Sequence, residues 1–154
     1  VSSGALDIAV MYQPEYRPGA RVELLLEEKL VLVTTTPPGS GTDERQDYVY
    51  VDWGHDFAQH HELSFPDDGN PGLYVNLGPL ALDYVLAAGG SGYFRQRIVA
   101  PHIAAGRLHP VPGAPSFFYP IYAVCSAQAD DGLVSLALEG LRVIAAADKD
   151  EKAP

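Results

Sequence analysis

The stretch from Leu80 to Val111 constrains the fold of this chain more than any other. It opens on an apolar run whose members fall on one face of a helix, at Leu82, Val85, Leu86 and Gly89. Such a face must pack against another element, most naturally a sheet.

A run of glycines, Gly89-Gly90-Ser91-Gly92, ends this helix and precedes Tyr93-Phe94 and a second short helix. Glycine adopts positive φ at little cost and lets another group approach the backbone closely. The turn therefore suits the floor of a ligand cleft, although simple packing explains the glycines as well. At the other end of the helix, Pro79 suits a first helical turn, where a missing N–H costs nothing.

Strands and helices alternate along the chain, which favours an α/β fold with a largely parallel central sheet. A buried strand is expected over Leu6–Tyr12, and Arg21–Thr35 predicts either two strands or one bent strand, with charges at a turn or an edge. Further strands are expected over Tyr48–Val51, Leu73–Val75, Gly92–Phe94 and Ser116–Ser126.

Further helices are expected after Asp52, placed as an N-cap, to about Leu63, and over Ile98–Ala104 with an interruption near Pro101. A last helix runs from Leu133 to about Ala147. Its apolar residues should cover a sheet, and they are Leu136, Leu138, Leu141, Val143 and Ile144.

Composition narrows the class of protein. A chain of 154 residues with 47% hydrophobic content can bury one core or two small lobes sharing a hinge. No apolar run approaches the ~20 residues that span a bilayer, so we expect a soluble protein. Its one cysteine, Cys125, cannot form an intrachain disulfide, which makes the cytoplasm the default location. The formal net charge of −10 opposes binding of this chain to DNA.

Two places offer a strand end followed by a helix start, where unpaired N–H groups and the helix dipole favour a ligand. One is Asp52-Trp53-Gly54-His55 and the other is Asn76-Leu77-Gly78-Pro79. Trp53 is equally understandable as a core anchor and Asn76 as an N-cap. Aromatic rings and amide donors suit a small carboxylate or aromatic acid. The candidate contacts are Trp53, Gly54, Asn76, Leu77, Gly78, Tyr93 and Phe94.

Four segments, in this order, resemble the effector-binding domain of LysR-type transcriptional regulators. They are Gly4-Ala5-Leu6-Asp7-Ile8-Ala9-Val10, Leu24–Val33, Val85-x-x-Ala88-Gly89-x-x-Gly92-Tyr93, and Gly106-Arg107-Leu108 through Val111. Gly90-Ser91 and Tyr93-Phe94 replace the small and aliphatic residues more usual in that family. The resemblance extends from Gly4 to about Ala147.

The resemblance implies a type 2 periplasmic-binding-protein-like fold with two lobes and a hinge, the first lobe being incomplete. It assigns residues 4–40 and 116–147 to the partial first lobe, 45–115 to the second lobe and 148–154 to a frayed tail. The effector cleft would lie between the lobes, with Tyr12 at the hinge. The resemblance also implies a bacterial, homo-oligomeric regulator that reads DNA through a winged helix-turn-helix absent from this chain.

A rival hypothesis is a small α/β metal-dependent enzyme or ligand carrier. Imidazoles and carboxylates concentrate around one expected helix, at Asp52, His55, Asp56, His60, His61 and Glu62. Asp56 and His60 are four residues apart and could share a metal, but a solvated helix face explains the pattern without one, and no His-Glu-x-x-His spacing occurs. Neither a nucleophile elbow nor a nucleotide-binding loop is present, so the sequence predicts a protein without catalytic activity, metal or cofactor.

Overall fold

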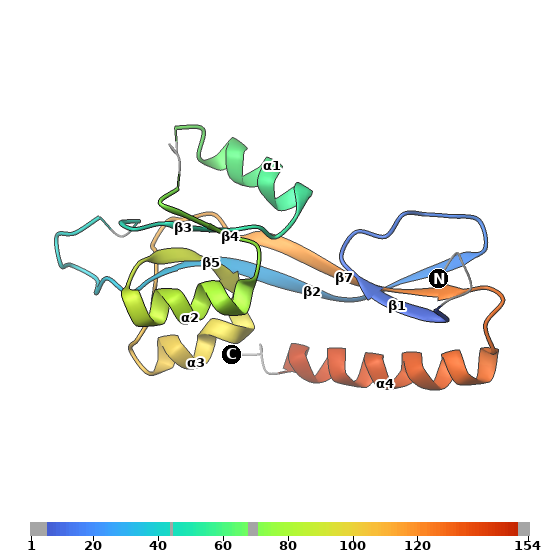
Figure 1. Cartoon of the computed structure of the whole chain (residues 1–154). Coiled ribbons are helices and arrows are strands. Elements are labelled where there is room, and N and C mark those ends of the chain that lie inside the picture. Colours follow the sequence, from blue (N-terminus) through green and yellow to red (C-terminus); the bar gives the residue numbers. More distant parts are fainter. Residues whose placement is uncertain (1–5, 44, 68–70, 151–154) are drawn as a thin grey trace. The chain divides into compact units, whose positions relative to one another are not determined.

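The computed structural model describes residues 6–43, 45–67 and 71–150, with no side chains described for 148–150 (Figure 1). Gly4 and Ala5 of the first motif and residues 151–154 of the expected tail lie outside this range. The elements are β1 (Ile8–Met11), β2 (Ala20–Thr34), β3 (Val49–Val51), α1 (His55–Ser64), β4 (Leu73–Val75), α2 (Gly78–Ala88), β5 (Ser91–Arg95), α3 (Gln96–Ala104), β6 (His109–Pro110), β7 (Phe117–Ser126) and α4 (Asp131–Asp150).

The chain forms two compact units, one of residues 1–28 and 119–154 and the other of residues 29–118. The boundaries fall inside strands β2 and β7, whereas the sequence placed them near residues 40 and 116. The reason lies in β2, which is one strand of 15 residues. It passes through the charged residues Glu27 to Lys29 without a turn, so the single-strand alternative is the correct one.

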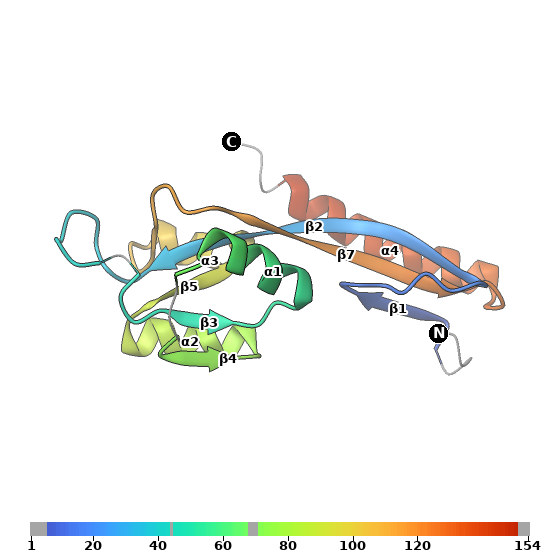
Figure 2. The ribbon, with the colours of Figure 1, turned by 90° about the horizontal axis from the view of Figure 1, so that it is seen from above.

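Most strand pairs are antiparallel, and the prediction of a largely parallel sheet is wrong. The larger sheet has the order β1-β7-β2-β5, with β6 also paired to β2, and β2 and β7 are its longest strands (Figure 2). β1 pairs antiparallel with β7, and β2 pairs antiparallel with both β5 and β6. β3 and β4 pair in parallel in a second sheet, and an isolated parallel bridge joins Tyr48 to Ser91. Helix α2 connects β4 to β5, which belong to different sheets, and this crossover is not visible in the local sequence pattern.

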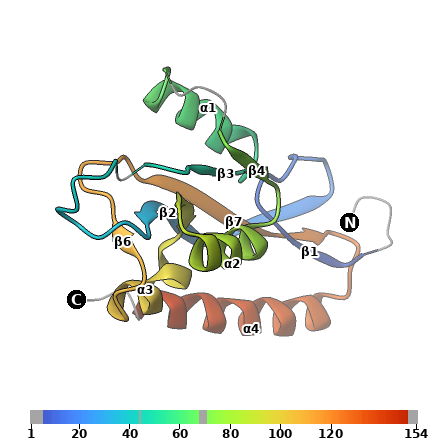
Figure 3. The ribbon, with the colours of Figure 1, turned by 60° about the vertical axis from the view of Figure 1, so that its left-hand side comes forward.

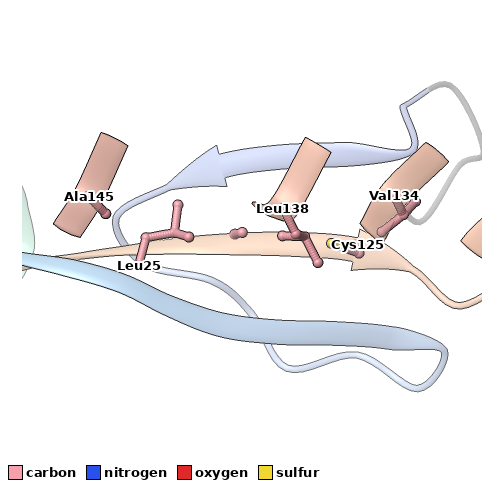
Figure 4. Packing of buried hydrophobic residues seen from close by; sticks show 6 residues of the cluster. Leu25, Cys125, Val134, Leu138 and Ala145 are labelled. Atoms are coloured by element: carbon pink, nitrogen blue, oxygen red, sulfur yellow. The ribbon is translucent and has the colours of Figure 1, made fainter. Parts of the chain in front are cut away.

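In the first unit, α4 packs on the sheet through one stripe of its surface. The core consists of Leu25, Ala123, Cys125, Val134, Leu138 and Ala145 (Figure 4). Of the helix residues expected in this core, Leu138 is buried and Leu141 is partly buried, while Leu136, Val143 and Ile144 are exposed. The helix is also longer than predicted, because it continues to Asp150 through part of the expected tail.

Strand β1 lies at the edge of the larger sheet and has only β7 as a neighbour in the described sheet. Val10 and Met11 are exposed, so the prediction of a buried strand is wrong. An apolar run shows β propensity, but it does not reveal whether the strand lies at the edge or the centre of a sheet.

In the second unit, α1 lies on one side of β3 and β4, and α2 lies on the other (Figures 1 and 3). Phe57 and His61 are the buried residues of α1. Their rings pack against those of Tyr93 in β5 and Phe117 in β7, which also contact each other, and the centroids of the contacting rings are 4.9 to 6.4 Å apart. These rings form the aromatic core of the unit. Aromatic side chains are favoured there because each buries a large apolar area and because aromatic rings prefer to pack at an angle to one another.

Helix α2 has the predicted bounds, beginning at Gly78-Pro79 and ending before Gly89. Helix α3 differs from its prediction because Pro101 lies within a continuous helix from Gln96 to Ala104. Pro101 falls in the second turn of a short helix, so little helix precedes it to be broken. Among the described residues, no helix is both long enough and apolar enough to cross a membrane.

Candidate functional site

A hollow of about 250 Å³ lies in the second unit, beside the start of α2 and the end of β5. Three of the candidate contacts, Trp53, Gly78 and Phe94, line it together. The remaining lining residues are Pro79, Leu82, Asp83, Arg95 and Ile98. The wall is therefore largely apolar, with one cation and one exposed carboxylate.

Trp53 forms one wall of this hollow, and its position is fixed from two sides. Its indole N–H donates a hydrogen bond of 3.0 Å to the backbone carbonyl of Tyr93. A Cβ added to Gly78 would lie 2.6 Å from the indole ring, so the ring packs directly on the backbone of α2. With 8% of its surface exposed, Trp53 is both a core anchor and a pocket wall.

Arg95 supplies the positive charge of the hollow. Its guanidinium carbon lies 5.3 Å from the centroid of the Trp53 ring, at cation–π distance. Its Nε is buried and has no hydrogen-bond partner among the described residues. A buried N–H without a partner is costly, and a carboxylate is the ligand group that a guanidinium binds best.

The start of α1 does not present an open anion site. The sequence predicted Asp52 as the N-cap of α1, but Gly54 occupies that position. The Asp52 carboxylate instead accepts hydrogen bonds from the Gly54 N–H at 2.9 Å and the Tyr74 hydroxyl at 2.7 Å. These two hydrogen bonds hold the pKa of Asp52 below its ordinary value, and the bond from Tyr74 has the larger effect. An anionic ligand would meet this fixed negative charge.

At the start of α2, the alternative that Asn76 is an N-cap is wrong. Leu77, not Asn76, is the N-cap of α2, and its apolar side chain cannot accept a hydrogen bond from the helix. Asn76 and Leu77 are both exposed at the end of β4. They are available to a ligand, although neither lines the Trp53 hollow.

Tyr93 is a core residue of the second unit and does not line the hollow. It is 0% exposed, and its hydroxyl donates a hydrogen bond of 2.8 Å to the carbonyl of Pro115. Tyr93 and Phe94 are neighbours on β5, so their side chains point to opposite faces. Phe94 alone reaches the hollow.

The glycine turn is bonded to other parts of the protein and does not line the Trp53 hollow. The Gly90 N–H donates a hydrogen bond of 2.9 Å to Oγ1 of Thr35, and the Gly90 carbonyl accepts one of 3.0 Å from the Thr35 N–H. Gly90 has φ of 134°, and a Cβ added there would lie 2.6 Å from the carbonyl oxygen of Asp47. Packing therefore explains this glycine.

Tyr12 belongs to the first unit, where it follows β1. Its ring stacks on Tyr119 with centroids 4.2 Å apart and planes 21° apart. The ring remains partly exposed. It is therefore an accessible aromatic surface of the first unit.

The His-rich helix divides its residues between core and solvent. His61 is buried and its Nε2 lies 2.8 Å from the Tyr48 hydroxyl, whereas His55 and His60 are exposed. Within residues 6–43, 45–67 and 71–150, no group of three His, Cys, Asp or Glu residues is arranged to hold a metal ion. His61, which the sequence analysis grouped with possible metal ligands, is therefore part of the aromatic core.

Sequence reasoning missed Arg95, which is the only cationic residue in the lining of the hollow. A signal existed, because Arg95 directly follows the Phe94 candidate at the end of a strand and precedes a helix. It was hidden by the fact that an isolated arginine is usually a surface residue. Only the three-dimensional structure shows that this strand end lies beside Trp53, which is distant in sequence.

Solved structures with this fold are numerous and distant in sequence. The bromide-bound regulatory domain of HypT from Salmonella typhimurium is 14% identical with a TM-score of 0.75, the match covering 95% of this chain and 75% of that one. The C-terminal domains of a LysR family protein from Agrobacterium tumefaciens strain C58 are 20% identical with a TM-score of 0.72, covering 95% and 75%. Full-length LysG from Corynebacterium glutamicum with bound effector Arg is 20% identical with a TM-score of 0.65, covering 94% and 52%.

The chain thus spans about half the length of a full-length regulator such as LysG. A comparison of the sequence with curated proteins finds no match. The family model described as the LysR substrate binding domain matches residues 1–142. These domains have the periplasmic-binding-protein-like fold expected from the sequence, and they are regulatory rather than catalytic. The chain belongs to the LysR substrate binding domain family.

Proposed function

We propose that this domain senses a small carboxylic acid at the hollow beside Trp53, with Arg95 as the carboxylate anchor. The observation that carries the proposal is the buried Nε of Arg95, which has no hydrogen-bond partner among the described residues and lies beside an aromatic wall. LysR regulator domains bind small-molecule effectors, and the coarse function of ligand sensing follows from the family.

The chemistry of the wall favours an acid with an apolar or aromatic body. Trp53, Leu82 and Phe94 offer apolar surface, and Arg95 offers directed N–H donors. Asp83 lies at the exposed rim, where solvent screens its repulsion of an anion. Exposed Asn76 and Leu77 at the start of α2 are proposed as further contacts.

Titration calorimetry with benzoate and related monocarboxylates tests this proposal on the full chain. We expect saturable binding that Arg95→Gln weakens about tenfold or more, since a charge-assisted hydrogen bond contributes about 1.5–3 kcal/mol. Arg107→Gln is the matched control because Arg107 is exposed and does not line the hollow. Equal affinity of the Arg95 and Arg107 variants would contradict the proposal.

We further propose that the full-length protein is a DNA-binding regulator in the bacterial cytoplasm, where its operator would lie. Winged helix-turn-helix residues outside this chain would read the DNA, because a domain with net charge −10 repels phosphate backbones. Effector binding would shift the population of domain conformations and so the arrangement of the DNA-binding parts.

Self-association is the second part of the proposal. LysR regulators are typically oligomeric. Helix α4 carries an exposed apolar stripe, which we define as Leu133, Leu136, Val143 and Ile144. These residues share one side of the helix, away from the side that contacts the core. An exposed apolar stripe on an acidic chain is most simply covered by a second copy of the domain.

A further inference from the structure

A second hollow of about 320 Å³ lies in the second unit, among residues of α1 and residues at and near β3. It is bordered by residues at and just before β3, by residues of α1, and by Phe65, Pro66 and Pro71. No residue is shared between its lining and that of the Trp53 hollow. Its lining residues are Tyr48, Tyr50, Ala58, His61, Glu62, Phe65, Pro66 and Pro71.

Four of the eight residues that line this second hollow are aromatic, and their rings pack against one another. His61 is 7% exposed, lies 2.8 Å through its Nε2 from the Tyr48 hydroxyl, and packs edge-on against Tyr50. Tyr50 in turn stacks on Tyr74 with centroids 5.3 Å apart, and Phe65 lies 5.0 Å from His61. The rings are therefore preorganised, which lowers the cost of ordering them around a ligand.

These rings already attract a cation from within the chain. The guanidinium carbon of Arg45 lies 4.0 Å from the centroid of Phe65 and 5.0 Å from that of Tyr48. Such positions are those in which the negative face of a ring stabilises positive charge. The two rings that contact Arg45 also line the second hollow, so a bound ammonium ion would share them with the guanidinium and would need a nearby negative charge to offset the repulsion.

The charged residue in the lining of the second hollow is an acid. Glu62 lies on α1 beside the aromatic wall and is exposed to solvent. A carboxylate beside three aromatic rings provides both an ionic partner and cation–π surfaces, which are the two elements of sites for organic ammonium ions. The acidic charge of the whole chain, −10, adds a long-range attraction for cations.

We propose that the second hollow is a binding site for a small organic ammonium ion, and that this domain therefore takes two ligands of opposite charge at separate places. The ammonium group pairs with Glu62, and the organic body lies against Tyr48, Tyr50 and Phe65. This site is independent of the carboxylate site, because each hollow has its own lining and its own charged residue.

The test is titration calorimetry of the full chain with benzylammonium, compared with benzyl alcohol as the uncharged probe of similar shape. We expect saturable binding of benzylammonium only. Glu62→Gln and Phe65→Leu should each weaken it about threefold to tenfold, the size of one cation–π or ionic contact. Glu139→Gln, an exposed acid on α4, is the matched control and should leave the affinity unchanged.

Two further variants distinguish this site from the carboxylate site. Ala58→Leu adds volume inside the second hollow and should abolish benzylammonium binding while benzoate binding stays unchanged. Arg95→Gln should have the reverse effect. Circular dichroism and thermal melting verify that each variant is folded. Binding of benzyl alcohol as tight as benzylammonium, no saturable binding of either, or an affinity indifferent to Glu62→Gln overturns the ammonium site without bearing on the carboxylate proposal.

Discussion

Gly90 leaves no room for a side chain, because an added Cβ would lie 2.6 Å from the carbonyl oxygen of Asp47. Its backbone N–H and carbonyl are both bonded to Thr35. The sequence predicted a glycine with positive φ at this turn, and φ is indeed 134°. It could not show which backbone approaches it, because Thr35 and Asp47 are far from Gly90 along the chain.

Gly90→Ala should therefore lower the stability of the domain more than Gly106→Ala. Gly106 also has positive φ, at 71°, but no atom lies within 4 Å of its added Cβ. The φ penalty alone is about 1–2 kcal/mol, and the clash at residue 90 adds to it. Urea denaturation of both variants measures the difference, and equal losses would show that the Asp47 contact relaxes freely.

The Asp52 carboxylate gives a second prediction at this scale. Its folded pKa is below the ordinary value, mainly because Tyr74 donates to it. The stability it contributes is thus present above the unfolded pKa, about 3.9, and is lost as pH falls through the lower folded pKa.

Tyr74→Phe removes the hydroxyl and keeps the ring that stacks on Tyr50. We expect the variant to melt at a lower temperature than the parent near neutral pH. The gap should narrow as pH falls below about 3.9, where protonation removes the charge that the hydroxyl stabilises. Melting curves across this range measure the effect, and a gap independent of pH would contradict the assigned cause.

Helix α4 shows how two faces of one element divide their roles. Leu138 is 2% exposed and packs with Val134 and Ala145 on the sheet, whereas Leu136 is 69% exposed. Both are leucines within one helix, so their intrinsic helix propensities are equal. Their different surroundings alone determine what each contributes.

Leu138→Ala should reduce the free energy of unfolding by about 2–5 kcal/mol, the range for deleting a buried leucine side chain. Leu136→Ala should change it by about 0.5 kcal/mol or less, as at other exposed positions. Denaturation at low protein concentration, where association is minimal, provides the comparison. Similar losses in both variants would mean that Leu136 contributes to folding of the single chain.

Elements were easier to predict from the sequence than their partners. Pro79 and Gly89 mark both ends of α2, because they act locally on the backbone. The antiparallel pairing of Leu30 with Arg95 joins residues distant in sequence, and no local pattern encodes it. Trp53, Gly78 and Phe94 were found as candidates from local patterns, whereas Arg95 became visible only through its contact with Trp53, a residue distant in sequence.

The molecule as a whole combines a net charge of −10 with an exposed apolar stripe on α4. Like charge opposes the association of two copies, and burial of apolar surface favours it. Because salt screens only the first of these effects, self-association through α4 should strengthen as ionic strength rises.

Sedimentation equilibrium should accordingly detect self-association that Leu136→Glu weakens about tenfold or more, since a charge would be buried without a partner. Ser135→Glu is the matched control, because Ser135 is exposed on the same helix but lies off the stripe. Unchanged association in the Leu136 variant, or an equal loss in the Ser135 variant, would place the contact elsewhere.

Trp53 is the one tryptophan in the sequence, and it forms a wall of the carboxylate hollow with Arg95 5.3 Å above its ring. The domain thus carries its single indole fluorophore at the place proposed for its effector. A ligand that draws the guanidinium away changes the electric field at the indole, and the emission wavelength shifts with it. The ammonium hollow does not include Trp53. Fluorescence excited at the long-wavelength edge of the protein absorption band, where tryptophan absorbs and tyrosine does not, should therefore respond to the carboxylate ligand and not to the ammonium ligand.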